Sequence, residues 1–279
     1  MMKKALPAAI SVLEKRKKDL AIWGEYEQQE FYEIMGVKGD AIITHSFVVC
    51  DDLSKGHVRK DAIEETTVIE FMRKSVDRML VIMRKLQIGK REVWYARDEY
   101  EAKADVEIRK ELPKETADCI VYKYGNFVNR TFMKNCSAYV RAVDTQYYKP
   151  SQYNNPNSIH INIGFNFTTK NLMGTNSKAS TLCHEVSHFN RVEYQPNSIE
   201  DQKNSKKNNI TDEDRKLDEQ LFPGAWGGVG TKDLPEDGKD HKEKNDPTYI
   251  NTRNTLKKNH DIQVFLNAYN FELYFEIIA

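Results

Sequence analysis

Residues 180–191 read Ser-Thr-Leu-Cys-His-Glu-Val-Ser-His-Phe-Asn-Arg, and within them His184, Glu185 and His188 spell the pattern H-E-x-x-H. Residues four apart lie on the same face of an α-helix, so the two histidines can offer imidazole nitrogens to one Zn²⁺ ion. Glu185 follows His184 by about 100° around the helix. Its carboxylate would stand beside the metal, where it can accept a proton from an activated water.

The opposite side of this segment is apolar. The pattern predicts a helix that is anchored to the core by one face while the histidines line a cleft. The apolar residues recur at spacings of three and four: Ala179, Leu182, Val186 and Phe189.

The composition limits the classes to which the protein can belong. The chain has 279 residues, 39% of them hydrophobic, which is enough for a large core. Lys+Arg and Asp+Glu both number 42, so nothing in the charge favours nucleic acid as a partner. No apolar run is long enough to span a membrane. The four cysteines are scattered, which indicates free thiols in a reducing compartment.

The first residues, Met-Met-Lys-Lys-Ala-Leu-Pro-Ala-Ala-Ile, resemble the opening of a signal peptide. Their apolar part ends at Leu13, however, and a charged run follows without a small-residue cleavage site. We therefore expect an amphipathic helix, no conventional signal peptide, and a protein that is cytoplasmic when made.

Periodicity predicts a mixed, largely helical chain of the α+β class. We expect one or two helices in 7–35, a strand over 41–50 and a long helix over 61–86. Strands are expected at 138–143 and over 158–167, the latter with Ile159, Ile161, Ile163 and Phe165 facing one way. Helical patterns close the chain from Tyr249 to Phe275.

Two polar stretches follow the motif. Residues 191–222 are nearly devoid of large apolar side chains and predict an exposed excursion with one short helix, 211–221. A glycine-rich turn ends at Asp233, and a second charged stretch covers 235–246. We therefore divide the chain into residues 1–60, of unknown role, and a domain of residues 61–279 with polar insertions at 191–228 and 234–246.

A catalytic zinc site needs a third protein ligand. In one class of zinc site the third ligand is a histidine, in the longer motif H-E-x-x-H-x-x-G-x-x-H. This class is excluded because Arg191 and Tyr194 stand at the glycine and third-histidine positions. A glutamate from a later helix is disfavoured, because neither Glu213 nor Glu219 has an aspartate four residues on. The remaining option is an aspartate.

Here the chain resembles the deuterolysin-type aspzincins, zinc metalloendopeptidases that include lysine-directed enzymes. Four landmarks occur in the family's order: an alternating strand at 159–167, the H-E-x-x-H helix, the turn Gly230-Thr-Lys-Asp-Leu, and the segment Asn267-Ala-Tyr-Asn-Phe-Glu. The resemblance covers about residues 158–276. It implies a zincin-like fold in which the active-site helix packs on a small β-sheet.

The resemblance also implies roles for individual residues. It makes His184, His188 and Asp233 the zinc ligands and Glu185 the general base. The chain departs from the family in two ways: Asp233 lies 45 positions after His188 (233 − 188), and Glu236 replaces the tyrosine expected three residues after the aspartate.

A second aspartate competes for the ligand position. Asp246-Pro-Thr-Tyr249 also reads D-x-x-Y. The glycine and threonine before Asp233 favour Asp233 as the ligand. Tyr249 is then the candidate hydrogen-bond donor to the oxyanion. We expect residues 234–246 to loop out, so that Tyr249 lies near the site.

Substrate binding is implied at the C-terminal landmark. Lysine-directed relatives carry an acidic pair there. In this chain Tyr269 takes the place of the aspartate and Glu272 is retained, so a protein or peptide substrate with a basic side chain is one expectation, without strict lysine specificity.

The sequence thus predicts a Zn²⁺-dependent endopeptidase. A setting as a bacterial effector or toxin, exported by a specialised secretion system and held in check by a cognate inhibitor protein, is the expectation that follows from the missing signal. The alternative is a catalytically inactive binding protein on a zincin scaffold, whose insertions mediate the contacts.

Overall fold

The structure is a computed structural model that describes residues 1–52, 57–93, 121–131, 133–140, 159–194, 225–235 and 247–277. About half of these residues are helical, and the strands form two small mixed sheets, which confirms the α+β class. Among the described helices, none combines the length and the apolar character that a membrane span requires.

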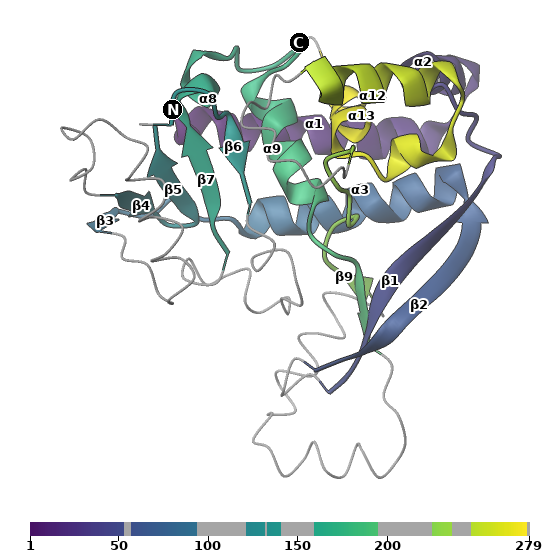
Figure 1. The fold of residues 1–279 in the computed structure, drawn as a ribbon, viewed down its shortest axis with the longest axis horizontal. Coiled ribbons are helices and arrows are strands. Elements are labelled where there is room, and N and C mark those ends of the chain that lie inside the picture. Colours follow the sequence, from purple (N-terminus) through teal and green to yellow (C-terminus); the bar gives the residue numbers. More distant parts are fainter. Residues whose placement is uncertain are drawn as a thin grey trace.

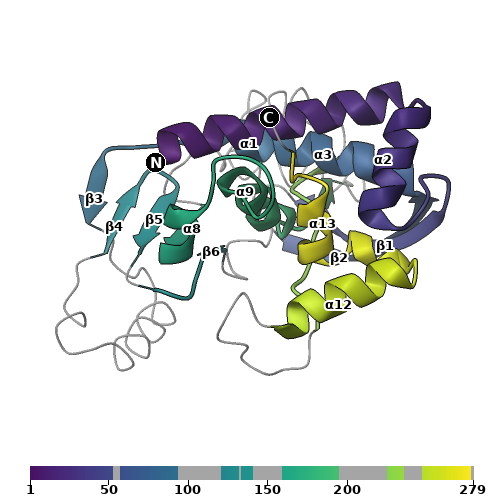
Figure 2. The same cartoon turned by 90° about the horizontal axis from the view of Figure 1, so that it is seen from above.

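The chain begins with two helices, as expected for residues 7–35. These are α1 (Met2–Ile22) and α2 (Glu25–Met35). Helix α1 packs against the central helices α3 (Val68–Lys85) and α9 (Lys178–Ser187) (Figures 1 and 2). The apolar residues at the start of the chain therefore belong to the core beneath the motif helix. Those that are buried include Ala5, Leu6, Ala9, Val12 and Leu13.

A long hairpin follows. Strand β1 (Ile42–Asp52) pairs antiparallel with β2 (His57–Thr67), and the expected division at residue 60 falls inside β2. The prediction of a helix from residue 61 was wrong for 61–67, because these residues pair with β1. Ile63, an apolar residue of the helix expected over 61–86, is 75% exposed. The helix starts only at Val68, where Thr67 Oγ1 accepts a hydrogen bond from the Glu70 N–H at 3.4 Å.

The hairpin belongs to a sheet with the order β2-β1-β8-β9. Strand β8 (Val192–Tyr194) runs parallel to β1, and β9 (Ala225–Trp226) is antiparallel to β8. The prediction of an exposed excursion from residue 191 was therefore wrong at its start, because Arg191 and Val192 are buried. Residues 195–224 and 236–246, including the expected helix 211–221, lie outside the described residues.

The second sheet has the order β3-β4-β5-β7-β6. Strand β7 (Ile161–Gly164), which lies between β5 and β6, is shorter than the expected strand over 158–167, because the chain turns at Gly164 into helix α8 (Phe165–Thr169). A Cβ on Gly164 would lie 2.3 Å from the Cys136 carbonyl oxygen, so the approach requires glycine. Phe165 is consequently exposed, whereas Ile159, Ile161 and Ile163 are buried. The strands are β3 (Arg91–Val93), β4 (Tyr122–Tyr124), β5 (Phe127–Arg130), β6 (Ala138–Tyr139) and β7 (Ile161–Gly164).

Helix α9, which carries the motif, lies at the centre of the molecule (Figure 1). It packs against α1, α3 and β6, and against α13 (Ala268–Leu273) near the C-terminus. Leu182, Val186 and Phe189 are buried, as the apolar stripe predicts. The chain reaches α13 through α12 (Pro247–Lys258) and the short helix η1 (Ile262–Phe265).

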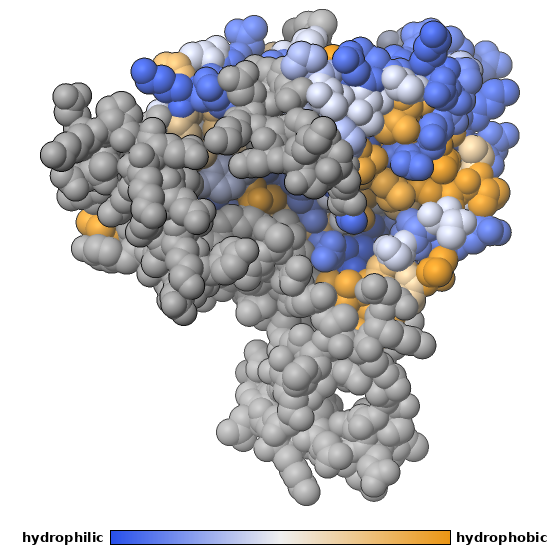
Figure 3. All heavy atoms as spheres, in the orientation of Figure 1, coloured by the Kyte–Doolittle hydropathy of each residue, from blue (hydrophilic) through white to orange (hydrophobic). Residues whose placement is uncertain are grey.

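On the face shown in Figure 3, the described surface is polar over the upper helices and more apolar along the hairpin of β1 and β2. Ile42 and Ile63 of this hairpin are among the exposed large apolar side chains.

Candidate metal centre

Helix α9 places the three residues of the motif. The Ser177 hydroxyl caps its first turn by accepting a hydrogen bond from the Ser180 N–H at 3.1 Å. His188 is the C-cap and keeps a right-handed helical conformation, so it remains one turn beyond His184. The two rings lie with their centroids 4.9 Å apart. Glu185 is 1% exposed.

The glycine-rich turn is bound to the end of this helix by its backbone. The Gly228 N–H donates to the Phe189 carbonyl at 3.0 Å, and the Gly230 and Thr231 N–H groups donate to the Ser187 carbonyl at 2.9 and 3.1 Å. Gly228 must be a glycine, since a Cβ there would lie 2.5 Å from the Val186 carbonyl oxygen. The turn is thereby fixed beside the two histidines.

The other side of the turn is bound to the segment that starts α13. The Lys232 N–H donates to the Leu266 carbonyl, and the Ala268 N–H donates to the Lys232 carbonyl, both at 2.9 Å. The Asn267 side chain accepts from the Leu234 N–H at 3.4 Å. Asp233 is therefore held between the end of α9 and the start of α13, two segments far apart in the sequence.

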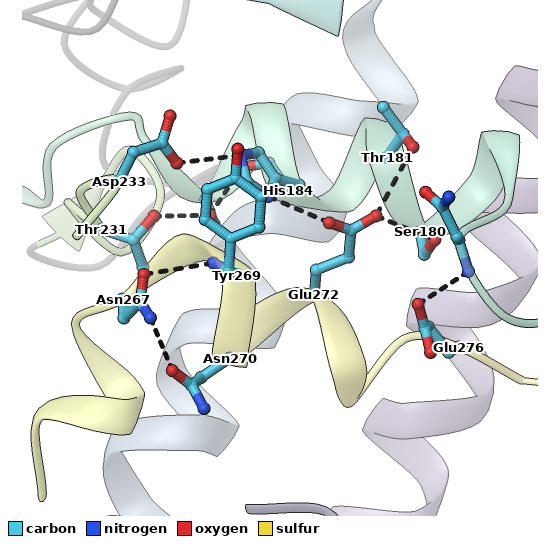
Figure 4. Close-up of polar contacts among 12 residues, drawn as sticks. Ser180, Thr181, His184, Thr231, Asp233, Asn267, Tyr269, Asn270, Glu272 and Glu276 are labelled. Atoms are coloured by element: carbon cyan, nitrogen blue, oxygen red, sulfur yellow. Dashed lines mark hydrogen bonds and ion pairs between the residues drawn. The ribbon is translucent and has the colours of Figure 1, made fainter. Parts of the chain in front are cut away.

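Three side chains of types that can bind a metal meet as a result. Ligand atoms of His184, His188 and Asp233 all lie within 4.8 Å of one another. Asp233 Oδ1 is 3.2 Å from His184 Nε2 and 3.7 Å from His188 Nε2 (Figure 4). The structure thus brings together the three residues expected as ligands.

The far nitrogen of each ring has its own acceptor. His188 Nδ1 lies 2.9 Å from the Thr231 carbonyl oxygen, and His184 Nδ1 lies 3.1 Å from Glu272 Oε2. A proton on each Nδ1 leaves a lone pair on each Nε2. His184 Nε2 is buried and makes no hydrogen bond of acceptable geometry within the described residues. A bound cation would give this buried nitrogen a partner, so the site fits a metal ion.

The charges around the two histidines differ. Burial lowers the pKa of His184, but Asp233 and then Glu272 outweigh it and raise this pKa to about 10. The pKa of His188 lies below its ordinary value because the ring is buried and stands beside His184. A proton on His184 therefore balances the neighbouring carboxylates, and a bound cation would replace it.

Glu185 and His184 open onto a cavity of about 370 Å³. Its walls come from the α8–α9 region, from α12 and from α13. The charged side chains that line it, besides these two, are Lys170, Arg253, Glu272 and Glu276. The cavity is large enough to admit several atoms of a peptide beside the three grouped side chains.

The two tyrosines have different places. Tyr269 packs its ring edge-on against His184, with centroids 5.0 Å apart, and Tyr249 stacks on the Tyr269 ring, also at 5.0 Å. Among the described ring contacts, Tyr269 therefore touches the motif directly, whereas Tyr249 touches Tyr269. Burial, and then the charges of Asp233 and Glu185, raise the pKa of Tyr269, so its hydroxyl stays protonated.

Glu272 is directed at the motif helix. Its carboxylate contacts His184 Nδ1 and accepts hydrogen bonds from the Ser180 and Thr181 hydroxyls (Figure 4). The expectation for this residue was substrate binding. The competing aspartate, Asp246, and the two disfavoured glutamates, Glu213 and Glu219, lie outside the described residues.

One contributor to the site was not anticipated. Arg78 of α3 is 7% exposed, and its Nε donates to the Gly228 carbonyl at 2.8 Å, which supports the turn from the side of the core. A signal was present in the sequence, since Arg78 lies at helical spacing between Phe71 and Ile82, on a face of α3 that is buried. A charged residue at such a position needs a buried partner.

Comparisons of the chain with protein-family models, with curated proteins and with solved structures gave no match. The inference of function therefore rests on the geometry of the site.

Proposed function

We propose that the chain is a zinc-dependent endopeptidase with a zincin-like fold, arranged as in the aspzincins that it resembles. His184, His188 and Asp233 hold the zinc ion, and Glu185 is the general base. The observation that supports this most directly is the grouping of the three ligand atoms within 4.8 Å, beside a cavity onto which Glu185 opens.

The donor set fits zinc. Zinc accepts imidazole nitrogen and carboxylate oxygen at about 2.0–2.2 Å in tetrahedral geometry, which puts neighbouring ligand atoms roughly 3.3–3.5 Å apart. The separations of 3.2 and 3.7 Å between Asp233 Oδ1 and the two Nε2 atoms agree with this. Three protein ligands leave one position open, which is typical of catalytic rather than structural zinc sites.

A zinc ion there would supply Lewis acidity, lowering the pKa of a water molecule and polarising a carbonyl group. The Glu185 carboxylate accepts the proton of the attacking water and passes it to the leaving amine nitrogen. A tyrosine hydroxyl donates to the carbonyl oxygen as it gains negative charge. The resemblance assigns this donor to Tyr249, whereas the ring contact with His184 favours Tyr269.

Metal analysis and a cleavage assay test the proposal together. Purified protein should hold one zinc per chain and cleave casein or a peptide mixture, and a chelator should abolish cleavage reversibly. Glu185→Gln should keep the zinc and lose at least about 100-fold in cleavage rate. His184→Ala should lose the metal itself.

Glu193→Gln, on strand β8, is the matched control and should cleave like the wild type, since Glu193 contacts Arg191 and none of the proposed ligands. A zinc-loaded Glu185→Gln protein with full activity would refute the mechanism. Zinc binding without cleavage of any peptide by the wild type would favour the non-catalytic binding protein.

A further inference from the structure

The carboxylate of Glu272 is engaged on both oxygens. Oε2 lies 3.1 Å from His184 Nδ1, and Oε1 accepts from the Ser180 hydroxyl at 3.1 Å and the Thr181 hydroxyl at 3.5 Å. The side chain is only 13% exposed. A carboxylate buried to this extent is retained where donors and charges compensate its desolvation.

The three donors share one face of helix α9. Ser180 and His184 are four residues apart, and Thr181 and His184 are three apart, so all three point toward α13. Glu272 meets them across the packed interface of α9 and α13, 88 residues along the chain from His184. This arrangement fixes the carboxylate relative to the ring from two directions.

The geometry determines the tautomer of His184. Its Nε2 faces Asp233 Oδ1 at 3.2 Å, on the side of the three grouped ligands. To bind a metal, Nε2 must offer a lone pair, so the proton of the neutral imidazole must be on Nδ1. Glu272 is the acceptor of that proton, and its negative charge makes the ring a stronger ligand.

We propose, resting on the zinc site proposed above, that Glu272 is a positioning residue that holds His184 for the metal and does not select a basic side chain of the substrate. An incoming ammonium group would have to displace His184 Nδ1 and two hydroxyls from the carboxylate. It would also approach Lys170, whose ammonium lies 2.7 Å from Thr181 Oγ1 on the same wall of the cavity.

Glu276 provides the matched control. It lines the same cavity four residues after Glu272, past the end of α13, but its Oε1 accepts from the Asn176 N–H at 2.7 Å, and no contact with His184 is found among the described residues. A change at Glu276 alters the charge of the cavity as much as a change at Glu272. A difference between the two variants therefore reports the contact with His184.

The experiment measures zinc affinity by competition with a chromophoric chelator on metal-stripped full-length protein. Glu272→Ala should weaken zinc binding by about 10- to 100-fold. The isosteric Glu272→Gln, which can still accept the Nδ1 proton but lacks the charge, should fall between Glu272→Ala and wild type. Glu276→Gln should bind zinc like the wild type. The visible spectrum of the Co²⁺ form should change in Glu272→Ala alone, because it reports the ligand field.

Two results would overturn the proposal. One is wild-type zinc affinity and Co²⁺ spectrum in both Glu272 variants, with a raised KM confined to lysine-containing peptides, since that marks a substrate pocket. The other is an equal loss of zinc affinity in Glu272→Gln and Glu276→Gln. Failure of the wild type to bind zinc is a separate result that sinks the proposed function itself.

Discussion

Replacing Asp233 by asparagine is the most direct test of how the proposed metal centre is built. Asparagine keeps the shape and one oxygen of the side chain but removes the negative charge. The two Nε2 atoms, 3.2 and 3.7 Å from Asp233 Oδ1, would lose their anionic neighbour. We expect the fold to persist, because the backbone of the turn is held by hydrogen bonds that do not involve this side chain.

The magnitude follows from the number of ligands. A structural zinc site contributes about 10–16 kcal/mol over four ligands, or roughly 2.5–4 kcal/mol for each. Losing one should weaken zinc binding by about 100- to 1000-fold. Zinc at about 1,000 times the wild-type Kd stabilises the fold by about 4.1 kcal/mol, and a 100-fold weaker site leaves roughly 1.4 kcal/mol at the same concentration. At about 2–4 °C per kcal/mol, the zinc-induced rise in Tm should shrink by roughly 5–10 °C.

Thermal unfolding with and without zinc is the assay. Asp77→Asn, at an exposed ion pair with Lys17, is the control and should leave the zinc-induced shift unchanged. Asp246→Asn tests the competing ligand. A full zinc-induced shift in Asp233→Asn, together with its loss in Asp246→Asn, would refute the assignment of Asp233.

Three further predictions concern the surroundings of the site. Tyr269→Phe should lower kcat more than Tyr249→Phe with KM little changed, because the Tyr269 ring contacts His184; the reverse order in steady-state kinetics would assign the donor to Tyr249. Burial disfavours the charged form of Glu64, but the hydrogen bond and charge of Arg191 lower its pKa to about 2 from 4.5. Because this folded pKa is depressed, Glu64→Gln should lower the free energy of unfolding above pH 5, by about 1 kcal/mol after solvent screening. The loss should shrink as the pH falls toward 2, in urea unfolding measured at a series of pH values. Arg78→Met should cost about 1.5–3 kcal/mol in the same assay because the buried Gly228 carbonyl loses a charged donor; no change in stability would mean that Arg78 does not support the turn.

The sequence predicted best where periodicity and core packing agree. The two N-terminal helices and the motif helix follow from apolar residues at helical spacing, and these residues are buried in the structure. Prediction failed at residues 61–67, where pairing with β1 decides the conformation. It also failed at Arg191 and Val192, where a strand forms next to a partner more than 140 residues earlier in the chain. Such pairings are long-range and leave no local pattern.

The candidate site divides in the same way. His184, Glu185 and His188 are readable from the sequence alone, because one helical turn fixes their spacing. Asp233 required the resemblance, since a spacing of 45 positions after His188 (233 − 188) gives no distance in space. Its place beside the histidines comes from backbone hydrogen bonds to Ser187 on one side and Leu266 on the other.

By itself, the sequence determined which residues can bind a metal and which face of α9 carries them, because helix geometry is local. Only the tertiary structure decided what surrounds them. The packing of α13 on α9 brings Glu272, predicted as a substrate contact, against His184. The packing of α3 places Arg78 under the turn of Asp233. These contacts depend on how helices from different parts of the chain meet, which no short stretch of sequence encodes.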